Sequence, residues 1–168
     1  CIRDSARSVG QLRMIYNHKP STYFHKYADE KKTPLYPFGY GLSYTNYKYS
    51  APSLSNNTLN KKNEITVTVE ITNTGDVDGE EIAQLYIRDN VSSATRAVKE
   101  LKGYKRVALK AGETKKVTFS LNAESLAFYD INMVYCLEPG KFTIMTGSSS
   151  NSKDLKKAIL TINNRIEL

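Results

Sequence analysis

Tryptophan is absent from this 168-residue sequence, and cysteine and histidine occur only twice each. Two cysteines, Cys1 and Cys136, cannot build a disulfide-rich scaffold or a zinc site of four cysteines. His18 and His25 add too few ligands to favour a metal centre. We therefore expect no metal and no cofactor, and we expect Cys136 to be a small buried side chain near a strand.

Long apolar runs are also missing, because no stretch approaches the roughly 20 residues that a membrane helix needs. No basic, then apolar, then small-residue signal segment opens the chain. We expect a globular protein without a membrane partner. The chain begins at Cys1, which suggests a processed or truncated piece, and a lipid anchor at Cys1 is the alternative.

The usual catalytic patterns cannot be found. A Ser-His-Asp arrangement has only His18 and His25 to draw on, and neither a Gly-Xaa-Ser-Xaa-Gly elbow nor a phosphate-binding glycine loop is present. Paired carboxylates could act on a sugar, but no spacing singles out a pair. The candidates are Asp29, Glu30, Asp89, Asp130 and Glu138. We assign no catalytic residue.

The charge is one-sided, with 24 Lys and Arg against 17 Asp and Glu, a net +7. Such a surplus is typical of proteins that bind nucleic acid or another polyanion. Here, however, the lysines fall in pairs beside expected turns and strand ends. A solvated face is the favoured interpretation, phosphate binding is the alternative, and no nucleic-acid partner is expected.

The region 64–73 gives the strongest structural signal. Ile65, Val67, Val69 and Ile71 alternate with polar residues, which predicts a half-buried strand. Turn-rich segments then separate further short strands. The others are expected at 81–88, 102–109, 116–121, 126–129, 133–135, 141–146 and 157–163. About seven strands with such turns predict an all-β protein, an antiparallel β-sandwich.

The first 34 residues are expected to be irregular. Val9, Leu12, Met14 and Ile15 could form a short strand, and 20–34 is expected to be an extended connector. In the strand expected at 81–88, Ala83, Leu85 and Ile87 are predicted to face one side of the sheet, and Ile82, Gln84 and Tyr86 the other.

Aromatic residues crowd the N-terminal third, because eight of the twelve tyrosines lie between Tyr16 and Tyr49. The segment 35–45 reads LYPFGYGLSYT, and its prolines and glycines predict a loop. Its rings could bury area against a neighbouring domain, stack on a sugar, or form an internal cluster. We favour the domain contact, because sugar platforms lean on tryptophan.

The sequence PLYPFGYGLSYT at 34–45 resembles the segment that introduces the C-terminal fibronectin type III-like domain of family 3 glycoside hydrolases. VEITNTGDVDG at 69–79, KELKGY at 99–104, KAGETK at 110–115 and EPGKF at 138–142 match the family in order. The head, SVGQ at 8–11 with YNHKP at 16–20, is similar to the last strand of the preceding α/β sandwich domain. Ala97 after Arg96 departs from the proline that is usual in the family.

The resemblance implies an immunoglobulin or fibronectin type III-like sandwich with an irregular N-terminal extension. It places a remnant of the α/β domain plus a linker at 1–34 and the sandwich at 35–168. The parent would be a secreted or periplasmic retaining glycosidase of the β-glucosidase or β-xylosidase type. Its catalytic Asp and Glu motifs cannot be placed here, so the chain's own status as an enzyme stays open.

The implied role is non-catalytic packing on the catalytic domains of the same polypeptide. The expected interface residues are Tyr36, Phe38, Tyr40, Leu42 and Tyr44. The alternatives are an independent carbohydrate- or cell-wall-binding module, with an oligosaccharide as partner, and an enzyme in its own right. An exposed aromatic loop could also join two copies of the chain as a homo-oligomer.

Overall fold

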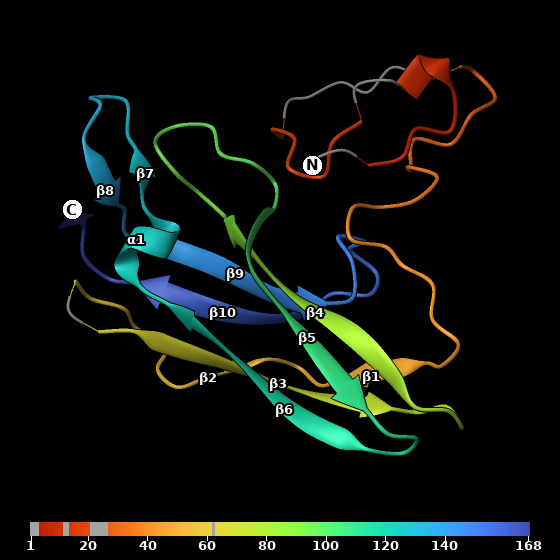
Figure 1. Cartoon of the computed structure of the whole chain (residues 1–168). Helices are drawn as coiled ribbons and strands as arrows, with labels where there is room; N and C mark the ends of the chain where they lie inside the picture. The colour runs from red at the N-terminus through yellow and green to blue at the C-terminus, as the bar shows by residue number, and fades with distance from the viewer. Residues whose placement is uncertain (1–3, 12–13, 21–26, 62) are drawn as a thin grey trace.

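The computed structural model describes residues 4–11, 14–20, 27–61 and 63–168. These residues form two antiparallel sheets packed face to face, with a small third sheet at one end (Figure 1). The elements in chain order are η1 (Val9–Gln11), β1 (Tyr47–Tyr49), β2 (Ser53–Leu54), β3 (Ile65–Asn73), β4 (Gly79–Asp89), β5 (Glu100–Leu109), β6 (Thr114–Leu121), α1 (Ala123–Leu126), β7 (Phe128–Tyr129), β8 (Tyr135–Leu137), β9 (Gly140–Gly147), β10 (Lys156–Ile162) and β11 (Ile166–Glu167).

The first sheet is built around β3. Strand β6 pairs with β3 along its whole length, whereas β1 and β2 share the other edge. The side chains of β3 alternate strictly between buried and less buried positions, as its sequence pattern requires. Its four apolar residues, Ile65, Val67, Val69 and Ile71, are fully buried.

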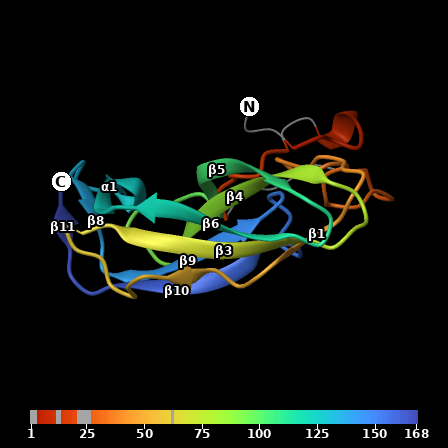
Figure 2. The same ribbon diagram turned by 60° about the horizontal axis from the view of Figure 1, so that its bottom comes forward.

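The second sheet has the order β10-β9-β4-β5 and lies against the first, as the turned view in Figure 2 shows. Alternate residues of β4 point into the space between the sheets, where Leu85 and Ile87 join Phe142, Ile144 and Leu160. A register shift lies between Leu85 and Tyr86 in the pairing with β5. The core therefore draws on both sheets, which is the arrangement of a β-sandwich.

The third sheet, of order β11-β8-β7, and α1 cover one end of the sandwich. Asn122 caps α1 by accepting a hydrogen bond from the backbone N–H of Ser125. Cys136 is fully buried in β8, as its sequence context predicts. Neither helical element in the described part of the chain is long and apolar enough to cross a membrane.

The N-terminal segment, here the described residues 4–11, 14–20 and 27–45, runs outside both main sheets. It lies beside the loop that joins β9 to β10, as Figures 1 and 2 show, and the backbone of Ser150 in that loop donates to the carbonyl of Phe38. Tyr16 and Phe38 pack on Tyr86, Met145 and Leu155, on the face of the second sheet opposite the core. Both faces of this sheet are therefore covered near its middle.

The predicted all-β sandwich is confirmed. Eleven strands are described rather than about seven, because β1, β2 and β11 are only two or three residues long and were not expected. β7, also of two residues, lies within the strand expected at 126–129. The predicted strand at 133–135 is displaced to β8, since Met133 takes a positive φ of 61° in a turn.

One local expectation is wrong. Val9 lies in the 3-10 turn η1 and is exposed, whereas a short strand was expected there. Leu12 of that expected strand lies outside the described residues, as do Cys1 and His25.

On β4, Ala83, Leu85 and Ile87 face the core, and Ile82, Gln84 and Tyr86 share the opposite face. The N-terminal segment buries Gln84 and Tyr86 there, whereas Ile82 is exposed.

Candidate functional site

The aromatic strip, defined as Tyr36, Phe38, Tyr40, Leu42 and Tyr44, lies on a loop without regular secondary structure, as its prolines and glycines predict. Four of its side chains are open to solvent, at 51% for Tyr36, 49% for Tyr40, 90% for Leu42 and 102% for Tyr44. The strip therefore presents several large apolar side chains to solvent within one short loop.

Phe38 is the exception, because its ring points inward. It stacks on Tyr16 with ring centroids 4.3 Å apart and planes 16° apart. Tyr16 in turn meets Tyr86 of β4 edge to face at 5.8 Å. Phe38 therefore anchors the strip to the outer face of the second sheet instead of presenting a free ring.

Backbone hydrogen bonds fix the same point of the loop. The N–H of Phe38 donates to Oδ1 of Asp4 at 2.6 Å, and the N–H of Ser150 donates to the carbonyl of Phe38 at 2.8 Å. Burial raises the pKa of the Asp4 carboxyl above its usual range, and the hydrogen bond from Phe38 opposes that rise. The loop is thus held from two sides.

Gln84 of β4 adds a side-chain clasp. Its Nε2 donates to the carbonyls of Gly39 at 3.1 Å and Ser148 at 2.6 Å, and its Oε1 accepts from the hydroxyl of Tyr86 at 2.5 Å. Gly39 has a φ of +78°, and a Cβ at this position would collide with the Gln84 side chain. A residue without a Cβ is therefore required where the loop crosses β4.

Beyond this clasp the strip leaves the sandwich. The rings of Tyr36 and Tyr40 stack on each other at 5.3 Å, with planes 23° apart, and both remain half exposed. Leu42 and Tyr44 extend further into solvent. The structure thus divides the five predicted interface residues into one internal anchor and four outward-facing side chains.

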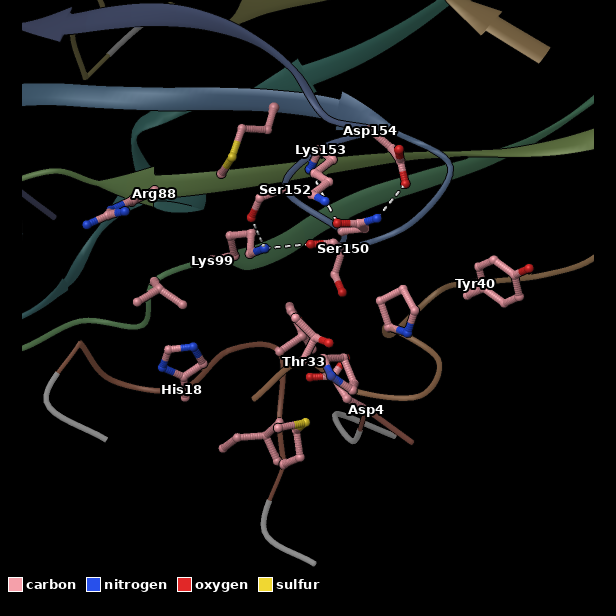
Figure 3. A pocket seen from close by; sticks show the side chains of 18 of the residues that line it. Asp4, His18, Thr33, Tyr40, Arg88, Lys99, Ser150, Ser152, Lys153 and Asp154 are labelled. Carbon is pink, nitrogen blue, oxygen red and sulfur yellow. Dashed lines mark hydrogen bonds between the residues drawn. The ribbon is translucent and has the colours of Figure 1, made fainter. Parts of the chain in front are cut away.

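A cavity of about 1000 Å³ opens between the N-terminal segment and the outer face of the second sheet. Figure 3 shows Arg88, Lys99 and the 150–154 loop on one side, with Asp4 and His18 on the other. Nζ of Lys99 donates to the carbonyl of Ser150 at 2.5 Å. Partial burial lowers the pKa of Lys99, and the nearby Asp4 carboxyl opposes that change.

Four of the five carboxylates that were considered for catalysis make structural contacts. Asp89 pairs with Arg96 at 3.2 Å, and Glu30 accepts a hydrogen bond from Ser8. Asp130 and Glu138 both contact Arg165, at 2.8 and 3.8 Å.

Asp130, Cys136 and Glu138 bring their ligand atoms within 4.8 Å of one another. The guanidinium of Arg165 holds the pKa of Asp130 below its usual range, since it donates to Oδ2 of that carboxylate. Burial raises the pKa of the Cys136 thiol, which disfavours the thiolate that a metal would need. The arrangement fits a buried ion pair better than a metal centre.

Sequence reasoning missed Gln84, Lys99 and the cavity. Gln84 is a single polar residue on a strand, which is ordinary for a solvent-facing position. Lys99 belongs to a lysine-rich stretch that was interpreted as a solvated face. No local pattern links either residue to the N-terminal segment, so only the tertiary structure shows their role.

Comparison with known proteins gives a consistent result. Residues 81–150 match the family model described as a fibronectin type III-like domain. A β-xylosidase of Formosa agariphila is 45% identical over 93% of this chain and 22% of its own length. A periplasmic β-glucosidase of Salmonella typhimurium is 43% identical over 86% of this chain and 20% of its own length. The chain thus spans about a fifth of these relatives.

Solved structures agree. A β-glucosidase from Erythrobacter marinus superposes with a TM-score of 0.87 at 38% identity, covering 95% of this chain and 21% of that one. A β-glucosidase from Listeria innocua, in complex with glucose, gives 0.85 at 34% identity, covering 96% and 24%. The chain therefore contains a fibronectin type III-like domain, of the kind found in β-glucosidases and β-xylosidases of glycoside hydrolase family 3.

Proposed function

We propose that this chain is a non-catalytic, C-terminal part of a β-glucosidase-like glycoside hydrolase, and that it docks on and stabilises the catalytic domains of the same polypeptide. The observation that carries the proposal is the exposure of Leu42 and Tyr44 on a loop whose backbone is fixed by Asp4 and Ser150. A fixed loop presents its apolar side chains at little further cost in conformational entropy.

The proposed division follows the same reasoning. Residues 1–34 would belong to the preceding α/β domain and its linker, and 35–168 to the sandwich. In support, the described part of 1–34 contributes no strand to any of the three sheets. Since one relative is named a periplasmic β-glucosidase, we propose a periplasmic or extracellular location.

The energetic scale is sufficient for stabilisation. Fully burying one large apolar side chain contributes about 1.5–3 kcal/mol. Leu42 and Tyr44 together could therefore supply a substantial fraction of the roughly 5–15 kcal/mol by which a domain is stable.

The test uses the proposed full-length polypeptide, which joins this chain to its catalytic domains, with Leu42→Ser and Tyr44→Ser combined. We measure hydrolysis of aryl β-glucosides and aryl β-xylosides after incubation at elevated temperature. The half-life of this activity should fall several-fold, because the domains separate more readily. The isolated 168-residue chain should keep its melting temperature, because both side chains are already exposed. An unchanged half-life in the longer polypeptide would contradict the docking role.

The matched control is Tyr104→Ser combined with Ile131→Ser. Both side chains are exposed, at 70% and 73%, but they lie outside the aromatic strip. This pair of changes should leave the half-life unaltered. If the control shortens the half-life as much as the strip variant does, the effect comes from replacing any exposed apolar side chain and not from the strip.

An independent carbohydrate-binding module is the second candidate, because the stacked Tyr36–Tyr40 pair presents ring faces on which a sugar could stack. Sedimentation of the 168-residue chain with insoluble glucan and xylan tests it. Retention that is lost in Tyr36→Ala would favour this candidate over docking. Size-exclusion chromatography of the same sample tests whether the strip joins two copies.

A further inference from the structure

The cavity beneath the N-terminal segment is lined by an unbalanced set of charges. Two carboxylates contribute to its walls, those of Asp4 and Asp154. Six cationic side chains also line it: Arg7, Lys32, Arg88, Lys99, Lys153 and Lys157. The walls therefore carry a net positive charge although they come from segments far apart in the sequence.

None of these six cations forms a salt bridge with any carboxylate in the part of the chain that the structure describes. Six cationic side chains elsewhere on the sandwich do form salt bridges. These paired residues are Arg96, Lys102, Arg106, Lys115, Lys116 and Arg165. Both cavity carboxylates accept other hydrogen bonds, Asp4 from the N–H of Phe38 and Asp154 from Nδ2 of Asn151. The cavity thus gathers in one place several cations without a carboxylate partner among the described residues.

Strand register brings several of these groups to one face. Arg88 of β4 pairs with Thr143 of β9, and Lys157 of β10 pairs with Met145 of β9. These residues lie on the outer face, and Lys99 enters from the segment before β5. Burial lowers the pKa of Lys99 and the Asp4 carboxyl opposes that change, whereas the positive charges of Lys157 and Arg88 add to it, so both cations lie near enough to act on Lys99.

Lys99 is the fixed member of this group. Its Nζ donates to the carbonyl of Ser150 and to the hydroxyl of Ser152, at 2.5 and 2.9 Å. Two of the three ammonium protons are thus committed, and one remains for a ligand. A lysine held in this way is preorganised for an anion, unlike a freely rotating surface lysine.

The remaining lining suits a ligand with hydroxyl groups. Amide and hydroxyl side chains, among them Asn90, Thr143 and Ser152, alternate with apolar surfaces from Tyr40 and Ile159. A volume of about 1000 Å³ lies at the upper end of the range for small-molecule sites. Cations, hydrogen-bonding groups and ring faces together match a sugar that carries an acidic group.

We propose that this cavity binds an anionic sugar of the uronic-acid class, whose carboxylate lies among Arg88, Lys99 and Lys157 and whose hydroxyls meet the amide and hydroxyl side chains. Tyr36 and Tyr40 of the aromatic strip also line the cavity. The proposal nevertheless does not depend on the docking role of the strip, because its readout is binding of a small ligand to the 168-residue chain itself.

The test is a titration of the ¹⁵N-labelled 168-residue chain, followed by amide shifts, with three probes: glucuronate, glucose and acetate. We expect glucuronate to bind at least about tenfold more tightly than glucose, because the charged group adds a charge-assisted contact. Glucuronate should also bind more tightly than acetate, which lacks the hydroxyls. The affinity for glucuronate should fall as the sodium chloride concentration is raised. The shifts should fall on Arg88, Lys99, Thr143 and Lys157.

Lys157→Gln and Lys156→Gln form a matched pair of variants. The two lysines are neighbours on β10 and both are exposed, but only Lys157 lines the cavity. We expect Lys157→Gln to weaken glucuronate binding about five- to tenfold and Lys156→Gln to leave it unchanged.

The proposal would be overturned by no shifts with glucuronate, by equal affinity for glucose and glucuronate, or by equal losses in the two lysine variants. Acetate binding as tight as that of glucuronate would also overturn it, since the site would then recognise a bare carboxylate and not a sugar.

Discussion

The hydroxyl of Tyr49, on β1, donates a 2.6 Å hydrogen bond to Oε1 of Glu81 on β4, so a buried phenol and a buried carboxyl join the two main sheets. Burial raises the pKa of Glu81 above its usual range, and the hydrogen bond from Tyr49 offsets part of that rise. Burial, with the negative charge of Glu81, also raises the pKa of Tyr49, which therefore stays protonated. The hydrogen bond links the two sheets, but burial of the Glu81 carboxylate disfavours its charged form.

Glu81→Gln should raise the stability of the chain at neutral pH. Because the folded-state pKa of Glu81 lies above its unfolded value, the folded state binds the extra proton. Stability therefore falls as pH rises from the ordinary carboxyl range through that raised pKa. The glutamine keeps an acceptor for Tyr49 without a charge, so the variant should lose this slope, and each kcal/mol gained should appear as about 2–4 °C in melting temperature.

Thermal unfolding between pH 4 and pH 8 measures this difference. Glu80→Gln is the control, because Glu80 is the exposed neighbour on the same strand. It should keep the wild-type pH slope. A Glu81→Gln protein that follows the wild-type curve at every pH would contradict the assignment.

Tyr49→Phe should destabilise the chain at pH 7 by about 1–3 kcal/mol, because it leaves the Glu81 carboxylate buried without its donor. Tyr47→Phe provides the comparison on the same strand. The hydroxyl of Tyr47 is buried and has no hydrogen-bond partner among the described residues, so its removal should be neutral or slightly stabilising. Urea unfolding at pH 7 distinguishes the two, and equal losses would refute the difference in partners.

Gly39→Ala should release the aromatic strip from the sandwich. Two penalties combine, a left-handed backbone with a φ of +78° and a collision with the Gln84 side chain. Gly112→Ala carries only the first, since its φ is +74° and the space around it is open. We expect Gly112→Ala to cost about 1–2 kcal/mol and Gly39→Ala about 1–3 kcal/mol more, through the lost Gln84 hydrogen bonds.

Hydrogen exchange supplies the second readout for these glycine variants. The amide of Ser150, which donates to the carbonyl of Phe38, should exchange faster in Gly39→Ala and at the normal rate in Gly112→Ala. Equal protection in both would mean that the clasp by Gln84 does not hold the loop.

Phe38→Ala should lower the stability of the 168-residue chain, by about 1.5–3 kcal/mol, because its ring is part of the cluster with Tyr16 and Tyr86. Tyr44→Ala should change it by less than about 0.5 kcal/mol, since that side chain is fully exposed. Chemical unfolding of both variants checks the division of the strip into anchor and free surface. A Tyr44→Ala loss as large as that of Phe38→Ala would be inconsistent with it.

The main strands could be predicted because their sequences alternate. Ile65 to Ile71 is apolar at every second position, and β3 shows the same alternation in burial. Gly112, between β5 and β6, takes a φ of +74°, which favours glycine. β2 and β11 could not be found in this way, because two residues are too few to show a period.

The covering of the second sheet could not be predicted for a different reason. Tyr16 and Tyr86 are 70 positions apart, and nothing local to Tyr86 distinguishes a ring facing solvent from one facing a distant segment. Arg88, Lys99 and Lys157 are equally scattered, so their convergence depends on strand register. The prediction that Tyr36 to Tyr44 forms a domain contact remains a prediction.

The position of the N-terminal segment has a consequence for synthesis. Its aromatic residues are made before the strands that they cover, since Met145 and Leu155, on which Tyr16 and Phe38 pack, follow more than a hundred residues later. At about 5–20 residues per second, Tyr16 and Phe38 wait on the order of ten seconds for their binding face. During that interval the nascent chain exposes the side chains that later cover the second sheet.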